Sequence, residues 1–230
     1  MKFEISKAPF EKCLATAKNR MKKAQAELEM VELLLRGNNI SDAASRAFDF
    51  ADAAERLALV GRELPAFTGN PRARILMEDK MLEVIPIRIG FTKERWFFVS
   101  IPILLPRKAK GSPAFIRDAL HPAMSRFFLG KNPVRYDDCV LIFRHVYNRE
   151  RPEREYRDHD NVELSSVVNI IALHILYDDA PLRCAHYYCS ASGEKDETQV
   201  FVVPRDEFGS WLDAEKNYNG REILLYENPY

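Results

Sequence analysis

The sequence predicts an α+β protein in which an antiparallel helical hairpin is followed by a β-sheet with helices packed on one face. Three observations support this fold class: a heptad pattern near the N-terminus, a turn-rich break after it, and a series of strand and helix patterns beyond residue 80. We therefore expect a coiled-coil-like hairpin over 1–66, a linker over 67–79, and an α+β domain over 80–230 that ends in a short C-terminal extension.

A heptad pattern predicts the first helix, because its apolar residues alternate between spacings of four and three for four repeats. These residues are Phe10, Leu14, Ala17, Met21, Ala24, Leu28, Val31 and Leu35. The stretch Gly37-Asn38-Asn39 ends this helix, and Ser41 is a good N-cap for a second, alanine-rich one. The short link favours an antiparallel hairpin, which serves either internal packing or assembly into a homo-oligomer.

The remaining elements follow from periodicity and turn residues. Strands are expected at 84–91, 95–104, 139–147, 182–190, 199–203 and 223–225, and helices at 112–129, 161–176 and 206–215. The strands at 182–190 and 199–203 are expected to run antiparallel, joined across the sequence ASGEKDET. Pro86 and Pro102 indicate edge positions or bulges, because proline cannot donate to a ladder, and Pro122 should kink its helix.

Composition excludes some classes of protein. The chain has 34 basic and 34 acidic residues, and this balance argues against tight non-specific DNA binding. Its four cysteines lack zinc-site spacing, so we interpret them as buried thiols in a reducing compartment. No apolar stretch approaches the roughly 20 residues of a membrane span. We expect a cytoplasmic protein that does not enter a membrane.

Four carboxylates bracket one apolar segment that is expected to be helical. Asp158 and Asp160 precede it, and Asp178 and Asp179 follow it. In an extended segment, residues two apart point the same way, and two carboxylates beside a third suit a hard cation such as Mg²⁺. Two structural readings compete: a capping box formed by Asp160 with Glu163, and a turn over 178–181. Spacing alone does not decide between a metal site and these structural roles, because a helix carries the chain away from its start.

The order D-x-D-N, apolar helix, D-D resembles the RusA-like family of Holliday junction resolvases. Asp160 and Asp179 are nineteen positions apart, which is similar to the interval in that family. The sequences VSIPILLPRKAKGS and VLIFRHVYNRERPEREYRDHDN resemble the regions that precede the motif. The resemblance covers roughly 80–204 and implies a mixed sheet. The hairpin together with this core also resembles an uncharacterised family of bacterial mobile-element proteins.

The resemblance implies a catalytic site. Asp158, Asp160 and Asp179 match the acids that bind Mg²⁺, or Mn²⁺ in its place, while Asn161 and Asp178 match accessory motif positions. The family is dimeric and cleaves DNA four-way junctions by metal-dependent phosphodiester hydrolysis. This implies branched DNA as substrate and a homodimer as the working form.

Basic residues near the motif are candidate DNA contacts: Lys108, Lys110, Arg154 and Arg157. The arginines alternate with glutamates, so a solvated, self-compensated loop is the competing interpretation. His159, between the two acids, is a candidate general acid. We expect His174, Trp96 and Trp211 to be packing residues instead.

One position departs from the resolvase pattern. The family usually has a lysine four residues after the second acid, and this chain has Leu164 there. A cation at that position would stabilise charge that develops in the transition state, and leucine cannot do so. We therefore expect weak or lost cleavage with metal binding retained. The alternative is a non-catalytic DNA-binding or assembly protein of a mobile element.

Overall fold

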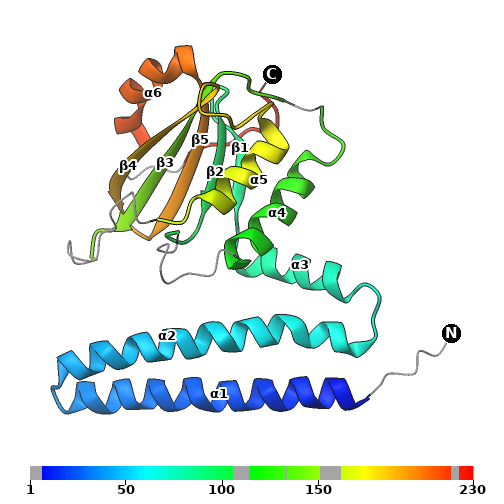
Figure 1. The fold of residues 1–230 in the computed structure, drawn as a ribbon. Helices are drawn as coiled ribbons and strands as arrows, with labels where there is room; N and C mark the ends of the chain where they lie inside the picture. The colour runs from blue at the N-terminus through cyan, green and yellow to red at the C-terminus, as the bar shows by residue number, and fades with distance from the viewer. Residues whose placement is uncertain (1–6, 106–113, 133, 151–161, 219–222, 230) are drawn as a thin grey trace. The chain divides into compact units, whose positions relative to one another are not determined.

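The computed structural model describes residues 7–105, 114–132, 134–150, 162–218 and 223–229, and these form two units (Figure 1). The first unit is Met1–Lys80 and the second is Met81–Tyr230. No helix in the described ranges is both long and apolar enough to cross a lipid bilayer. The fold class is α+β, as predicted.

The first unit contains the predicted helical hairpin. Helix α1 (Lys7–Arg36) and helix α2 (Ile40–Glu63) pack side by side along their lengths (Figure 1). The prediction of Ser41 as N-cap is wrong, because Asn39 takes this position and its side chain accepts a hydrogen bond from the Asp42 amide at 3.4 Å. Asn38 adopts a left-handed backbone with φ of 56°, which turns the chain between the helices.

Only one line of the heptad pattern faces α2. Along this line Ala24 is buried, and its neighbours one heptad away, Ala17 and Val31, are half-buried. The other line is exposed at Met21, Leu28 and Leu35. The side chains that the two helices bury are all small: Cys13, Ala24, Ala43 and Ala53.

The segment expected to be a linker is largely structured. A short 3₁₀ helix, η1 (Leu64–Thr68), continues α2, and helix α3 (Ala73–Val84) follows it. Because α3 reaches Val84, the first strand begins at Arg88, four residues later than predicted.

The second unit is built on a five-stranded mixed sheet of order β1-β2-β5-β3-β4. Its strands are β1 (Arg88–Phe91), β2 (Phe97–Ile101), β3 (Cys139–Asn148), β4 (Cys184–Gly193) and β5 (Glu197–Pro204). Neighbouring strands are antiparallel except β3 and β4, which are parallel. Helix α5 (Ser165–Ile175) therefore lies in a β-α-β crossover between β3 and β4.

The strands β4 and β5 run antiparallel as predicted, but they are not paired with each other. Strand β3 lies between them and pairs with both along its length. Nine of the ten residues of β3 are buried, as expected for a central strand covered on both faces. A continuous apolar run predicts a buried strand but does not show which strands lie beside it.

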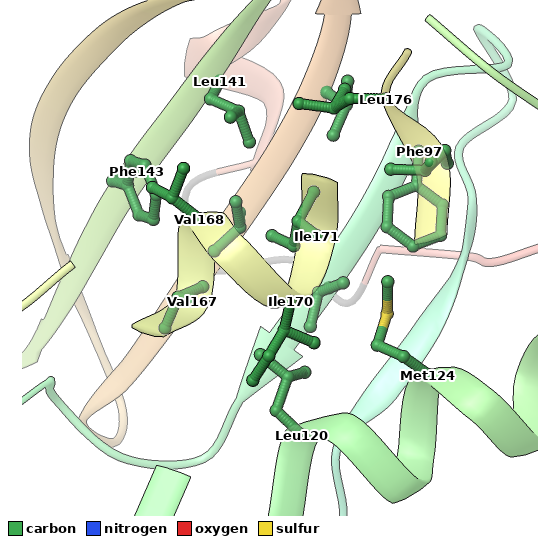
Figure 2. Packing of buried hydrophobic residues seen from close by; sticks show 14 of the residues in the cluster. Phe97, Leu120, Met124, Leu141, Phe143, Val167, Val168, Ile170, Ile171 and Leu176 are labelled. Carbon is green, nitrogen blue, oxygen red and sulfur yellow. The ribbon is translucent and has the colours of Figure 1, made fainter. Parts of the chain in front are cut away.

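The two longer helices of this unit lie on one face of the sheet. Helix α4 (Ala114–Phe128) contains Pro122 and packs beside α5 (Figure 1). Figure 2 shows side chains of α4 and α5, among them Met124, Ile171 and Val168, directed toward Phe97, Leu141 and Phe143 of the strands. This face forms an apolar core.

The opposite face carries a shorter helix, which was predicted at 206–215 but was expected on the same face as the others. Helix α6 (Phe208–Ala214) lies between the 3₁₀ turns η4 (Arg205–Glu207) and η5 (Glu215–Tyr218). Trp211 of α6 is fully buried, with its ring centroid 5.5 Å from that of Phe201. Trp96 lies in the same cluster, so the expectation of two core tryptophans is confirmed.

The C-terminal segment makes one bridge in place of the predicted strand at 223–225. Phe91 of β1 and Tyr226 exchange backbone hydrogen bonds of 2.8 and 2.9 Å. Gly90 permits this approach, because a Cβ there would lie 2.8 Å from Leu225 Cβ and 2.9 Å from the Tyr226 carbonyl oxygen. The chain end is thus fastened to the edge strand β1.

Candidate functional site

The residues predicted to form the metal site flank α5, and the structure describes part of this set. The following predicted residues lie outside the described ranges: Lys108, Lys110, Arg154, Arg157, Asp158, His159, Asp160 and Asn161. Asp178 and Asp179, which follow α5, are described. No three His, Cys, Asp or Glu side chains in the described ranges are grouped so that they could hold a metal ion.

Helix α5 begins later than predicted. Its first residue is Ser165, its N-cap is Leu164, and the Glu163 carboxylate accepts a hydrogen bond of 3.1 Å from the Ser165 amide. The capping box of Asp160 with Glu163 is therefore wrong, because Asp160 precedes the first helical residue by five positions. Val162, which is buried in the apolar core, separates the two acids of the motif from the helix.

The far end of α5 is held in place by Arg135 and Tyr136. Arg135 Nη1 donates to the carbonyl oxygens of Ala172, Leu173 and Leu176 at 3.4, 3.0 and 2.7 Å. A cation at a helix C-terminus satisfies its last carbonyls and complements the helix dipole. The Tyr136 amide also donates to the Ile175 carbonyl at 2.9 Å. The loop that carries the two acids therefore leaves from a fixed point.

The two adjacent acids have different surroundings. The Asp178 carboxylate accepts a hydrogen bond of 3.2 Å from the Ala180 amide, so the turn reading is confirmed for this residue. Asp179 is exposed and makes no hydrogen bond or ion pair with any other described residue. The hydrogen bond with Cys139 lowers the pKa of the nearby Cys184 thiol, and the charge of Asp179 opposes that shift. Asp179 is thus the acid of this pair whose oxygens are available to a ligand.

The length of α5 sets a geometric condition on the site. Eleven residues of helix are about 16 Å long, and Asp179 lies beyond its C-terminal end while Asp160 precedes its N-terminal end. Five residues of extended chain span at most about 17 Å, so the segment from Asp160 to Ser165 is long enough to run back beside the helix. A shared cation therefore requires the segments that flank α5 to bring Asp160 and Asp179 back toward each other.

Leu164 occupies the position where the resemblance to the resolvases predicts a lysine. Its side chain is half-buried and packs against the apolar core under α5. Its carbonyl oxygen accepts hydrogen bonds from the amides of Val167 and Val168, each at 2.9 Å. The residue therefore has a packing role, and no positive charge comes from this position.

A polar row that sequence reasoning missed crosses the other face of the sheet. Arg88, Ser100, Gln199 and Arg144 are successive register partners on β1, β2, β5 and β3. The guanidinium of Arg144 is 1% exposed and donates to Gln199 Oε1 at 2.6 Å, while Glu215 Oε1 lies 3.9 Å from its Nε. Burial lowers the pKa of Arg144, and neighbouring acidic groups oppose that shift.

A cavity of about 400 Å³ adjoins this row. It is lined by Arg88, Phe98, Ser100, Arg144, Lys195, Glu197 and Gln199, among others. The Glu197 carboxylate accepts hydrogen bonds from Ser100 Oγ, at 2.9 Å, and from the Gln199 amide group. Cations and carboxylates are mixed here, so the row is a hydrogen-bonded network of balanced charge. Its only signal in the sequence is an arginine inside the buried strand CVLIFRHVY.

The cysteines are free thiols in the structure, as predicted. Cys139 and Cys184 are register partners on the parallel strands β3 and β4, and both are buried. The hydrogen bond between them lowers the pKa of Cys184 and raises the pKa of Cys139. Cys13 is buried and Cys189 half-buried.

The model of a protein family described as a family of unknown function, DUF6100, matches residues 6–228. The match spans both the hairpin and the sheet unit, so these two parts occur together in the family. No curated protein and no solved structure matches the chain.

Proposed function

We propose that this chain, which belongs to that family of unknown function, is a Mg²⁺-dependent endonuclease for branched DNA, of the Holliday junction resolvase type. The observation that carries the proposal is the order of acids around α5, D-x-D-N before it and D-D after it. The exposed carboxylate of Asp179, without a partner among the described residues, supports the proposal.

Asp158, Asp160 and Asp179 would hold the cation, and Mn²⁺ would bind the same oxygens. The bound metal would supply an activated water and would stabilise charge at the scissile phosphodiester. In this proposal Asn161 orients the acids and His159 protonates the leaving group, while Asp178 stabilises the turn after α5 and does not contact the metal. Lys108, Lys110, Arg154 and Arg157 bind the DNA backbone, which positions a branched substrate without reading its sequence. We place the activity in the cytoplasm, where the four thiols stay reduced.

Leu164 makes the proposed nuclease a weak one. Removing one group that stabilises transition-state charge typically lowers a rate by about 10² to 10³. Leu164 contributes to the core and not to the site, so no cation from this position reaches the phosphate. Metal affinity depends on the carboxylates, and we expect it to persist.

The packing of Leu164 in the core also supports a second function. With a packing leucine in place of a catalytic lysine, the chain would be a non-catalytic DNA-binding or assembly protein of a mobile element. In that case the acids around α5 keep a structural role, as Asp178 does in its turn.

Cleavage of a synthetic four-way junction with Mg²⁺ separates the two functions. We expect slow cleavage by the native chain, none by Asp160→Asn, and native behaviour by Asp178→Asn, because Asp178 is engaged in its turn. Leu164→Lys should raise the rate if it folds. Its thermal unfolding is measured first, because burial of a leucine contributes roughly 1.5 to 3 kcal/mol. Inactivity of the native chain and of a folded Leu164→Lys variant would favour the non-catalytic function.

A further inference from the structure

We propose that the hairpin of α1 and α2 is a self-association surface, on which the hairpin of a second copy of this chain packs in the opposite direction to form a four-helix bundle. This inference is independent of the proposed nuclease activity. It rests on which side chains the hairpin buries, which it exposes, and how its charges are distributed.

The hairpin leaves three of the eight residues of its heptad seam exposed. Met21, Leu28 and Leu35 are 53%, 51% and 55% exposed, and they follow one another at intervals of seven residues. Residues seven apart lie on one line of a helix and drift by only about 20° per repeat. The three side chains therefore form an apolar stripe along one side of α1.

Helix α2 offers a surface of small residues. Ala47 and Ala51 are exposed, while Ala54 and Ala58 are half-buried. A Cβ added at Gly61 would meet nothing within 4 Å, so this part of α2 is open as well. Small side chains allow helices to approach closely, and the distance between packed helices depends on the residues at the contact. A second hairpin can therefore come close enough to cover the stripe.

The internal contact of the hairpin is too small to account for its pattern. The side chains buried between α1 and α2 are a cysteine and three alanines. A four-repeat seam that leaves three of its large side chains exposed is expected to bury them in a partner.

The charge distribution indicates that this partner is a second copy. At the open end of the hairpin, residues 7–23 contain six basic residues and one acidic residue, a net charge of +5. Around the turn, residues 27–52 contain six acidic and two basic residues, a net charge of −4. Two hairpins that pack in opposite directions bring each acidic turn to a basic open end, whereas parallel packing brings like charges together.

A twofold axis satisfies this arrangement, because the same patch then meets itself in both copies. The size of the surface also suits a dimer. Helix α2 has 24 residues and is about 36 Å long, and two helices side by side are about 20 Å wide. The face is therefore on the order of 700 Å² per copy, close to the roughly 800 Å² of a standard interface.

The test is the mass of the full chain by sedimentation velocity over a range of concentrations. We expect the native chain, of 26.6 kDa, to sediment as a dimer. The triple variant Met21→Gln, Leu28→Gln, Leu35→Gln should raise the dimer dissociation constant by at least about 100-fold. The double variant Met30→Gln, Leu33→Gln changes exposed apolar residues outside the stripe and should remain dimeric. A native chain that stays monomeric, or a triple variant that dimerises like the control, would overturn the proposal.

Orientation is tested by zero-length carbodiimide cross-linking of a mixture of isotope-labelled and unlabelled chains. We expect links between copies to join lysines of 7–23 to acids of 27–52. Links between copies that join acids and lysines of the same end would overturn the opposite arrangement. If the triple variant loses helix content, the charge reversals Lys18→Glu and Lys22→Glu replace it. These leave the apolar contacts intact and should weaken the dimer, while an unchanged dimer would count against the charge argument.

Discussion

The two units of the molecule are stabilised by different kinds of contact. The sheet unit buries aromatic and branched side chains on both faces, such as Phe143, Ile171 and Trp211, each at most 1% exposed. The hairpin buries alanines and a cysteine and leaves both methionines of α1 and several leucines exposed. Because the free energy of burial scales with apolar area, the sheet unit gains more of it from its own side chains than the hairpin does.

The largest expected effect of a single substitution lies in the sheet unit. Phe143→Ala on β3 should lower the free energy of unfolding by about 3 to 5 kcal/mol, because it leaves a cavity in a closely packed core. The ring is fully buried and stacks on Tyr188, with 5.8 Å between centroids. Urea unfolding of the full chain measures this loss.

Leu28→Ala in the hairpin is the matched comparison. We expect it to change dimer affinity more than the stability of the sheet unit, because Leu28 is half-exposed in the single chain. If both substitutions lowered the same unfolding transition equally, the two units would not differ as described.

A smaller effect is expected at the most buried alanine between the two described hairpin helices. Ala53 is 1% exposed, so Ala53→Leu should force α1 and α2 apart and cost about 1 to 3 kcal/mol. Ala44→Leu, at an exposed position of the same helix outside the proposed contact surface, serves as the control and should be nearly neutral. Circular dichroism during thermal unfolding measures both. Equal melting temperatures for the two variants would mean that the alanine contact does not hold the hairpin together.

The smallest effect concerns the contact between α4 and α5. Burial lowers the pKa of His174, and the positive charges of His121 and Arg135 lower it further. The His174 ring stacks on Phe128, with 5.9 Å between centroids. Since the unfolded chain binds a proton more readily than this site, the stability that His174 contributes is present above its ordinary pKa and lost as the pH falls.

Urea midpoints at pH 7.5 and pH 5.5 test this dependence. The native chain should lose stability at the lower pH, and His174→Gln should lose less, because it has no imidazole to protonate. A variant as sensitive to pH as the native chain would place the titrating group elsewhere.

Much of the fold was predictable because local patterns determine it. The heptad spacing identified the hairpin, and the run CVLIFRHVY identified β3 within one residue. The pairing of the strands was harder to predict, because β4 and β5 are close in sequence but each is paired with β3. The heptad pattern also could not show that α2 covers one of its two lines, because that depends on how closely the alanines allow the helices to approach.

The candidate site also has parts that the sequence reveals and parts that only the fold brings together. The acids around α5 form a sequence motif, so a single segment of chain reveals them. The network of Arg144 with Gln199 joins residues 55 positions apart, and only the register of β3 with β5 brings them together. Helix α5 begins at Ser165, three residues after Val162, which is buried in the core. The apolar pattern of the sequence does not distinguish Val162 from a residue inside the helix.

The most direct test of the proposed site is calorimetric titration of the full chain with Mn²⁺, which replaces Mg²⁺ at oxygen ligands. We expect one ion per chain, at least about tenfold weaker binding in Asp160→Asn and in Asp179→Asn, and native binding in Asp178→Asn. The neighbouring acids make this a matched pair, because the Asp178 carboxylate is held by the Ala180 amide while Asp179 is exposed. Absence of binding by the native chain, or binding by Asp179→Asn as tight as native, would contradict a metal site shared across α5.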